Sequence, residues 1–268
     1  KHMSSRKLKY LLKSKSFEFA KNIKDKSHRI SSLTWNNKKV YYRTSSSDMV
    51  LIYEILLKSK YKREYYFPVE LKPKVIFDIG GNIGITSIYL ATVFPEAIIY
   101  TFEPLKENFE ILQKNTSQFK NIEVFNVGLG AENGSFKVYL SDDNENYGGV
   151  SFYSEVEGNL SEPFTECEVK NVNDILKELG INKVDLIKID TEGAEYDILT
   201  SINSEFLKKT SWITGELHGN RDFELLNYLN SLSFSISLNK NIDNRLFMFN
   251  AGKQEVISQL SRREIKIL

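Results

Sequence analysis

The chain has 268 residues, a formal net charge of +1, 41% hydrophobic residues and 26% charged residues, an ordinary composition for a globular domain. No run approaches the roughly 20 apolar residues of a membrane span, and no signal-peptide apolar segment is present, so the sequence predicts a cytoplasmic protein. The single cysteine, Cys167, excludes an internal disulfide and a multi-cysteine zinc site.

Basic residues gather in the first part of the chain. Residues 1–26 hold nine Lys or Arg against two acidic residues, a net charge of +7, and Leu8, Leu12, Phe19 and Ile23 recur near one helical face. This pattern predicts an amphipathic basic helix that packs on the following domain or on a second copy of the chain, which would give a homo-oligomer. Contact with a membrane or a nucleic acid is the alternative for such a helix.

The elements before the first core strand carry no recognisable motif. Residues 40–43 predict a short strand, and residues 48–58 predict a helix. Pro73 then marks the entry to the first long apolar strand. We therefore divide the chain into an N-terminal helical extension, residues 1–72, and a main domain, residues 73–268.

The strongest local signal is a strand, a glycine-rich turn and a helix within residues 75–94. Four apolar residues and Asp78 run into the turn, and helical spacing of apolar residues follows it. Such a unit places backbone amides at the carboxyl end of a parallel strand, where open α/β folds bind nucleotides. The turn residues expected to contact this ligand are Gly80, Gly81, Asn82 and Gly84.

Two acidic residues indicate which nucleotide is bound. Asp78 stands where a dinucleotide-binding loop has its first glycine. A carboxylate there would repel a pyrophosphate, but it suits a cofactor that carries an ammonium and a sulfonium. Glu103 ends the strand at residues 98–102, where it can accept both ribose hydroxyls, which NAD and S-adenosylmethionine share. The pair therefore favours S-adenosylmethionine, and the expected cofactor contacts also include Pro104, Gly128 and Asp190.

The middle of the chain predicts a third strand and an added antiparallel pair. The third strand covers residues 122–127, and residues 136–140 alternate as a strand that residues 169–172 can pair with. The polar loop at residues 141–149 is either a surface loop or a lid on the substrate side.

A second cluster of polar residues follows two later strands. The strand at residues 184–190 delivers Asp190 and Glu192 to the carboxyl edge of the sheet, and the strand at residues 212–217 delivers Glu216 and His218 to the same edge. Residues 234–238 and 245–249 then form a terminal antiparallel hairpin. Five strands alternating with helices, followed by this hairpin, predict an α/β, Rossmann-like, seven-stranded and mostly parallel sheet of the kind found in S-adenosylmethionine-dependent methyltransferases.

The motifs resemble those of the FkbM-type methyltransferases over roughly residues 75–218. Gly81 and Thr191 are mild departures, because the family usually has Ala and Val at these positions. The resemblance implies a class I fold and transfer of a methyl group to oxygen, commonly on sugars, polysaccharides or natural-product hydroxyls. The matching segments are residues 77–84, 102–104, 127–129, 133–134 and 185–195.

The chemistry at the second cluster is open at the level of sequence. Asp190 or His218 can act as the general base that takes a proton from a sugar hydroxyl. Alternatively, Asp190, Glu216 and His218 can hold Mg²⁺ or Mn²⁺, which would acidify the hydroxyl directly. Glu192 either contacts the substrate or stabilises the N-terminus of the next helix.

The sequence therefore predicts an S-adenosylmethionine-dependent O-methyltransferase that acts on a sugar, a glycan or a related small molecule. An NAD-dependent oxidoreductase or epimerase is one alternative, which Asp78 opposes. A nucleic-acid methyltransferase that uses the basic N-terminal segment is the other.

Overall fold

The structure, a computed structural model, describes residues 5–59, 65, 67–68, 70–139, 164–218, 221–240, 247–254 and 265–267. The loop at residues 141–149, predicted to be a surface loop or a lid, lies outside the described residues. Among the described helices, none combines the length and the apolar character needed to cross a bilayer.

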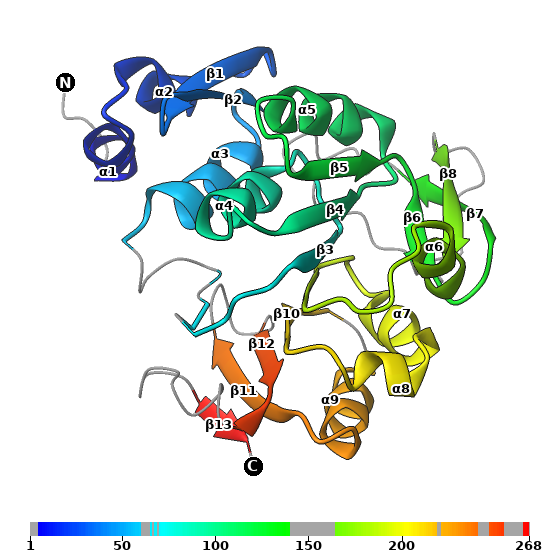
Figure 1. The fold of residues 1–268 in the computed structure, drawn as a ribbon. Coiled ribbons are helices and arrows are strands. Elements are labelled where there is room, and N and C mark those ends of the chain that lie inside the picture. Colours follow the sequence, from blue (N-terminus) through cyan, green and yellow to red (C-terminus); the bar gives the residue numbers. More distant parts are fainter. Residues whose placement is uncertain are drawn as a thin grey trace.

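The described residues form a central mixed sheet of eight strands in the order β13-β11-β12-β10-β9-β3-β4-β5 (Figure 1). Neighbouring strands are parallel from β10 to β5, and β12 lies antiparallel between β10 and β11. This confirms the predicted α/β, Rossmann-like, mostly parallel sheet with a terminal antiparallel hairpin; β13 is an eighth strand that the sequence analysis missed. The strand bounds are β3 (Val75–Ile79), β4 (Ile98–Phe102), β5 (Ile122–Phe125), β9 (Leu186–Ile189), β10 (Trp212–Leu217), β11 (Ser235–Lys240), β12 (Phe247–Gly252) and β13 (Ile265–Ile267).

Helices cover both faces of this sheet because its central strands are apolar on both sides. In β3, Ile76 packs into one buried cluster with α4 and the N-terminal elements, whereas Phe77 and Ile79 pack into the other with α6, α7 and α9. The helix bounds in the main domain are α4 (Ile85–Val93), α5 (Lys106–Thr116), α6 (Val172–Glu178), α7 (Glu195–Ser201), α8 (Ser204–Leu207) and α9 (Asp222–Ser231).

A small second sheet lies beside the central one. Its strands are β6 (Gly128–Gly130), β7 (Gly134–Tyr139) and β8 (Phe164–Asn171), in the order β6-β8-β7. The antiparallel pair β7–β8 forms the expected added strands, but the predicted partner was wrong: residues 136–139 pair with 164–167, whereas residues 169–171 pair in parallel with β6.

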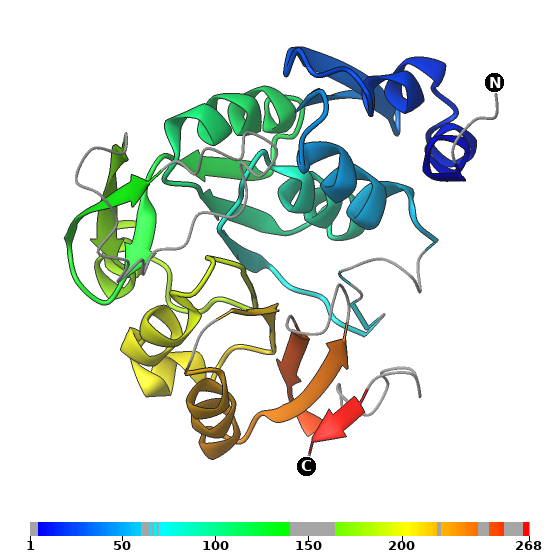
Figure 2. The ribbon, with the colours of Figure 1, turned by 180° about the vertical axis from the view of Figure 1, so that it is seen from behind.

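The N-terminal elements pack at one end of the central sheet, next to α4 and α5, while β11–β13 lie at the other end in both views (Figures 1 and 2). Residues 48–57 are helical as predicted, although the second half has π-helical hydrogen bonding. The hairpin strand β1 was not predicted, so this region is not purely helical. The bounds are α1 (Ser5–Ser14), α2 (Phe17–Asn22), β1 (Ile30–Trp35), β2 (Lys38–Arg43), α3 (Asp48–Leu51) and the π-helix η1 (Ile52–Leu57).

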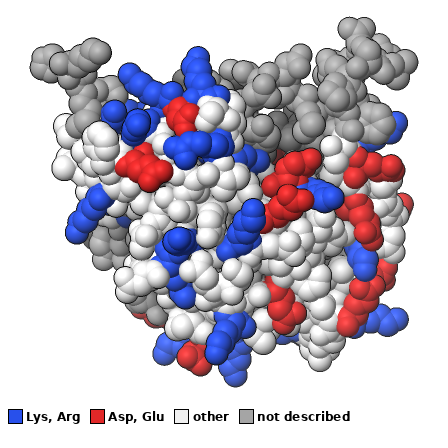
Figure 3. All heavy atoms as spheres, turned by 90° about the horizontal axis from the view of Figure 1, so that it is seen from above, with Lys and Arg blue, Asp and Glu red and all other residues white. Residues whose placement is uncertain are grey.

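The predicted basic helix is two helices. The chain turns at Lys15, which has a φ of 54°, and the Ser16 side chain caps α2 by accepting from the amide of Phe19. Leu12, predicted to lie on the packing face, is 68% exposed, and Tyr10 is buried instead. Figure 3 shows Lys and Arg spread among Asp and Glu over this side of the molecule, with acidic residues gathered toward the side where Figure 1 places β7 and β8. The segment therefore packs on the domain through its aromatic residues and presents many of its basic residues to solvent.

Candidate active site

The glycine loop after β3 lies directly against the segment that follows β9. Gly80 has a φ of 78°, and a Cβ built on it would lie 1.8 Å from the carbonyl oxygen of Asp190. The amide of Asp190 also donates to the carbonyl of Ile79 at 3.1 Å. Only glycine fits at this position without a backbone shift, because any side chain would overlap the neighbouring main chain.

The rest of the loop turns into α4. Gly84, with a φ of 84°, is the N-cap of that helix, and a Cβ on Gly81 would lie 2.3 Å from Thr101. Asn82 also has a positive φ, of 48°, and within the described part of the chain its buried Oδ1 has no hydrogen-bond partner. This oxygen is a free acceptor at the place where the sequence predicts a nucleotide.

Glu103 faces the glycine loop as the sequence predicts. Its Oε2 accepts from the amide of Asn82 at 2.8 Å, and its Oε1 accepts from the amide of Leu105 at 2.9 Å. Burial raises the pKa of Glu103 to about 7, although these two hydrogen bonds oppose the shift. Each carboxylate oxygen can accept a second hydrogen bond, so the group remains able to take a ribose diol.

Asp78 lies deeper than a ligand contact would require. Its side chain is fully buried: Oδ2 accepts from the Ser87 hydroxyl at 2.6 Å, and Oδ1 lies 3.3 Å from the ammonium of Lys188. Burial would lower the pKa of Lys188, but the charges of Asp78 and Asp190 and the contact with Asp78 together outweigh burial and hold the pKa above its usual value. A direct contact between Asp78 and the cofactor stays a prediction; in this structure the carboxylate contacts Ser87 of α4 and Lys188 of β9.

The four predicted catalytic residues come together around one imidazole. His218 Nε2 lies 3.0 Å from Glu216, 3.7 Å from Glu192 and 4.0 Å from Asp190. On the other side of the ring, Nδ1 lies 3.4 Å from Glu195. The sheet order explains the meeting, because β9 and β10 are parallel neighbours that end at the same edge.

The close approach of these buried groups shifts their pKa values. Burial alone would lower the pKa of His218, but the adjacent carboxylates of Glu195 and Glu216 and the charges of Asp190 and Glu192 raise it to about 11. Burial raises the pKa of Asp190 to about 6, against the opposing charge of Lys188. Burial and the charge of Asp190 raise the pKa of Glu192 to about 7. At neutral pH His218 is therefore an imidazolium without a free lone pair, and Asp190, with a pKa of about 6, is ionised.

The sequence analysis assigned no role to Glu195 or Lys188, although both contact residues of the site. Glu195 accepts from the amides of Thr191 at 2.8 Å and Gly193 at 3.0 Å, so it shapes the loop that carries Asp190. Lys188 stands in an otherwise apolar strand, and its Nζ donates to the carbonyl of Gly80 at 2.7 Å. A charge inside a buried-type strand was the signal that could have singled out Lys188.

Pro104 and Gly128 lie beyond Glu103. A Cβ on Gly128 would lie 3.6 Å from Cβ of Pro104, so these two predicted cofactor contacts are neighbours of each other. The cofactor role of both residues stays a prediction.

Asp190, Glu192 and His218 have the geometry of a cation site. Each offers one ligand atom, and the three atoms lie within 4.8 Å of one another. Oxygen and imidazole ligands suit Mg²⁺ or Mn²⁺. A cation there would have to displace the proton on His218, which the surrounding carboxylates hold firmly.

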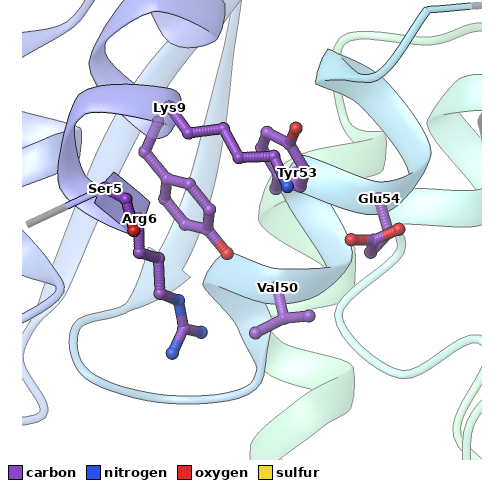
Figure 4. Close-up of a pocket in the computed structure, with 7 residues that line it drawn as sticks. Ser5, Arg6, Lys9, Val50, Tyr53 and Glu54 are labelled. Carbon is purple, nitrogen blue, oxygen red and sulfur yellow. The ribbon is translucent and has the colours of Figure 1, made fainter. Parts of the chain in front are cut away.

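A separate cavity of about 330 Å³ opens between α1 and the α3–η1 helix (Figure 4). Tyr10 and Tyr53 stack there at 4.8 Å between ring centroids, and Lys9 lies over Tyr53 at 4.7 Å. The cavity is in the N-terminal region, away from the acids that follow β9 and β10, and it plays no part in the site described above.

The sheet order, the glycine loop and the acid after β4 define the protein as a class I S-adenosylmethionine-dependent methyltransferase by fold. The sequence model of the FkbM methyltransferase domain matches residues 78–254. The chain belongs to the FkbM methyltransferase domain family, which confirms the resemblance found in its motifs.

Individual relatives are distant. Over 228 residues the chain is 26% identical to the AMB antimetabolite synthetase AmbE of Pseudomonas aeruginosa, covering 73% of this chain and 10% of that protein. It is 25% identical over 171 residues to the 2-O-methyltransferase NoeI of Sinorhizobium fredii, covering 59% of this chain and 68% of NoeI. A crystal structure of a methyltransferase FkbM from Methylobacillus flagellatus aligns with a TM-score of 0.49 at 19% identity, over 70% of this chain and 45% of that one. The chain spans less than two thirds of the length of the first relatives that it matches.

Proposed function

We propose that the protein transfers a methyl group from S-adenosylmethionine to a hydroxyl oxygen of a sugar, a glycan or a related small molecule. The site has two halves: the cofactor half is the glycine loop with Asp78 and Glu103, and the acid–histidine half is His218 with the four acids around it. The observation that carries the proposal is the direct contact between the Gly80 loop and Asp190, which brings these two halves together. The relative NoeI, named as a 2-O-methyltransferase, supports oxygen as the acceptor atom.

The residues of the cofactor half suit this role. Glu103 and the free Oδ1 of Asn82 would accept hydrogen bonds from the nucleoside. Bound S-adenosylmethionine supplies a methyl group that is activated by its sulfonium. The protein then has to orient the acceptor oxygen in line with that methyl group and to exclude water, which supplies much of the rate in such displacements.

Asp190 is the general base in this proposal. A pKa of about 6 leaves it ionised at neutral pH and still basic enough to accept a proton from a hydroxyl as the new bond forms. His218 is already protonated, so it cannot take that proton; it stabilises the carboxylates around it as a fixed cation. The sequence left the base open between these two residues, and their pKa values favour Asp190.

The test combines binding and turnover. S-adenosylhomocysteine should bind saturably in calorimetry, NADH should not bind, and a screen of nucleotide sugars and glycans should give a methylated hydroxyl. The exposed acid Glu205 on α8 provides the control, because Glu205→Gln should change neither binding nor turnover. Absence of S-adenosylhomocysteine binding would overturn the proposal.

The sequence also left two alternative functions open. Membership of a methyltransferase family replaces the NAD-dependent oxidoreductase or epimerase that the sequence left as an alternative. A nucleic-acid acceptor would show itself as affinity for RNA or DNA that falls steeply with salt. The cytoplasmic location, the boundary near residue 72 and a homo-oligomer formed through the N-terminal helices stay predictions.

A further inference from the structure

A row of polar side chains crosses the middle of the central sheet. In the strand register Asp78 pairs with Thr101 on one side and with Lys188 on the other, and Lys188 pairs with Thr214. None of the four residues is more than 2% exposed. Buried charges cost free energy unless they are paired, and an apolar pair would serve the core at least as well. Stability alone therefore does not explain why charged residues occupy this row.

From its place in this row, the Lys188 ammonium approaches three other groups. Its Nζ donates to the Gly80 carbonyl at 2.7 Å and lies 3.3 Å from Asp78 Oδ1 and 3.9 Å from Asp190 Oδ2. One ammonium therefore touches the glycine loop, the acid beneath that loop and the proposed base.

The contact with Gly80 fixes one particular peptide group. The carbonyl of Gly80 accepts from Lys188, and the amide of Gly81, on the same peptide, donates to the carbonyl of Phe102 at 2.9 Å. A peptide between two glycines rotates easily because neither residue has a Cβ. Lys188 and Phe102 hold it at its two ends, and loss of Lys188 would release one of them.

We propose that Lys188 is a positioning residue that fixes the Gly80–Gly81 peptide for cofactor binding and sets the place of Asp190 relative to that loop. The inference rests on the proposed function and deepens it, because a single buried ammonium then determines the geometry of both halves of the site.

The test compares Lys188→Met with a matched control, Lys183→Met. Lys183 lies just before the same strand and also pairs with an aspartate, Asp185 at 2.7 Å, but it is 49% exposed. We expect Lys188→Met to weaken S-adenosylhomocysteine binding roughly tenfold or more, since a hydrogen bond to a charged group is lost. Turnover of the best nucleotide-sugar acceptor at saturating cofactor should fall by a similar factor with an unchanged acceptor KM, and Lys183→Met should alter neither quantity.

A purely structural role makes a different prediction. In that case Lys188→Met lowers the unfolding temperature, while the folded protein keeps its wild-type affinity for S-adenosylhomocysteine and its wild-type kcat, and the inference is overturned. If the single variant does not fold, Asp78→Asn combined with Lys188→Met removes both buried charges together. Weaker S-adenosylhomocysteine binding in that folded double variant than in Asp78→Asn alone supports the inference, and equal binding by the two overturns it. Failure of the wild-type protein to bind S-adenosylhomocysteine would instead count against the proposed function itself.

Discussion

The carboxylates in the two halves of the site have different partners. In the cofactor half, Glu103 is held by main-chain amides and Asp78 faces the ammonium of Lys188. In the other half, four carboxylates face a single imidazole, and burial raises the pKa of Asp190 and Glu192. Burial also raises the pKa of Glu103, so the difference lies in how the acids are paired: the first half pairs each carboxylate with main-chain amides or an ammonium, whereas the second sets four carboxylates around one imidazole. This difference is what a binding surface beside a reaction centre requires.

The largest expected effect is on the cofactor half. Gly80→Ala places a Cβ where the Asp190 carbonyl already lies, so the loop must move and S-adenosylhomocysteine binding should be lost. Gly134→Ala is the control, because a Cβ there meets nothing within 4 Å. Calorimetry of both folded variants makes the comparison, and normal binding by Gly80→Ala would show that the loop does not form the cofactor site.

Removal of the charge on Glu103 should have a smaller effect on the same half. Glu103→Gln keeps the size of the side chain but removes the charged acceptor for the ribose diol, a loss of about 1.5 to 3 kcal/mol in binding free energy. Titration with S-adenosylhomocysteine measures the change. An affinity equal to wild type in a folded Glu103→Gln protein would place Glu103 outside the cofactor contacts.

The acid–histidine half should reveal itself in the pH dependence of stability. The folded protein raises the pKa of His218 from 6.5 to about 11, so the stabilisation from its proton is complete below pH 6.5 and is lost as the pH rises toward 11. The free-energy advantage of wild type over His218→Gln should therefore shrink by something on the order of 2 to 4 kcal/mol between pH 6 and pH 10. Urea unfolding at several pH values provides the measurement, and a constant difference would mean that His218 is not protonated in the folded state.

The sequence predicted the glycine loop and the place of Glu103 after its strand because local chain geometry determines both. Gly80 and Gly84 have the positive φ values that their residue type permits, and Glu103 follows its strand directly. The sequence also predicted that Asp190 and His218 lie at one edge of the sheet, since adjacent parallel strands end there. It could not show that Lys188 pairs with Asp78, 110 positions earlier, or that Glu195 faces the imidazole, because both contacts depend on the register of separate strands and on the loop that joins β9 to α7. The sequence left the base open between Asp190 and His218, and it could not show the raised pKa of His218, because that shift depends on carboxylates from other elements.

The smallest expected effect concerns metal. A proton on His218 opposes a cation at Asp190, Glu192 and His218, so a chelator should leave turnover unchanged. Turnover assays with and without chelator, followed by addition of Mg²⁺ or Mn²⁺, make the test. Loss of activity that either ion restores would establish metal-assisted chemistry in place of a carboxylate base.

The division between a binding half and a reacting half is tested most directly by Asp190→Asn. We predict that this change lowers kcat by roughly 10² or more, because the proton acceptor is needed only in the transition state. The dissociation constant for S-adenosylhomocysteine, measured on the same folded preparation by calorimetry, should stay within about twofold of wild type. A wild-type kcat in Asp190→Asn would contradict the account.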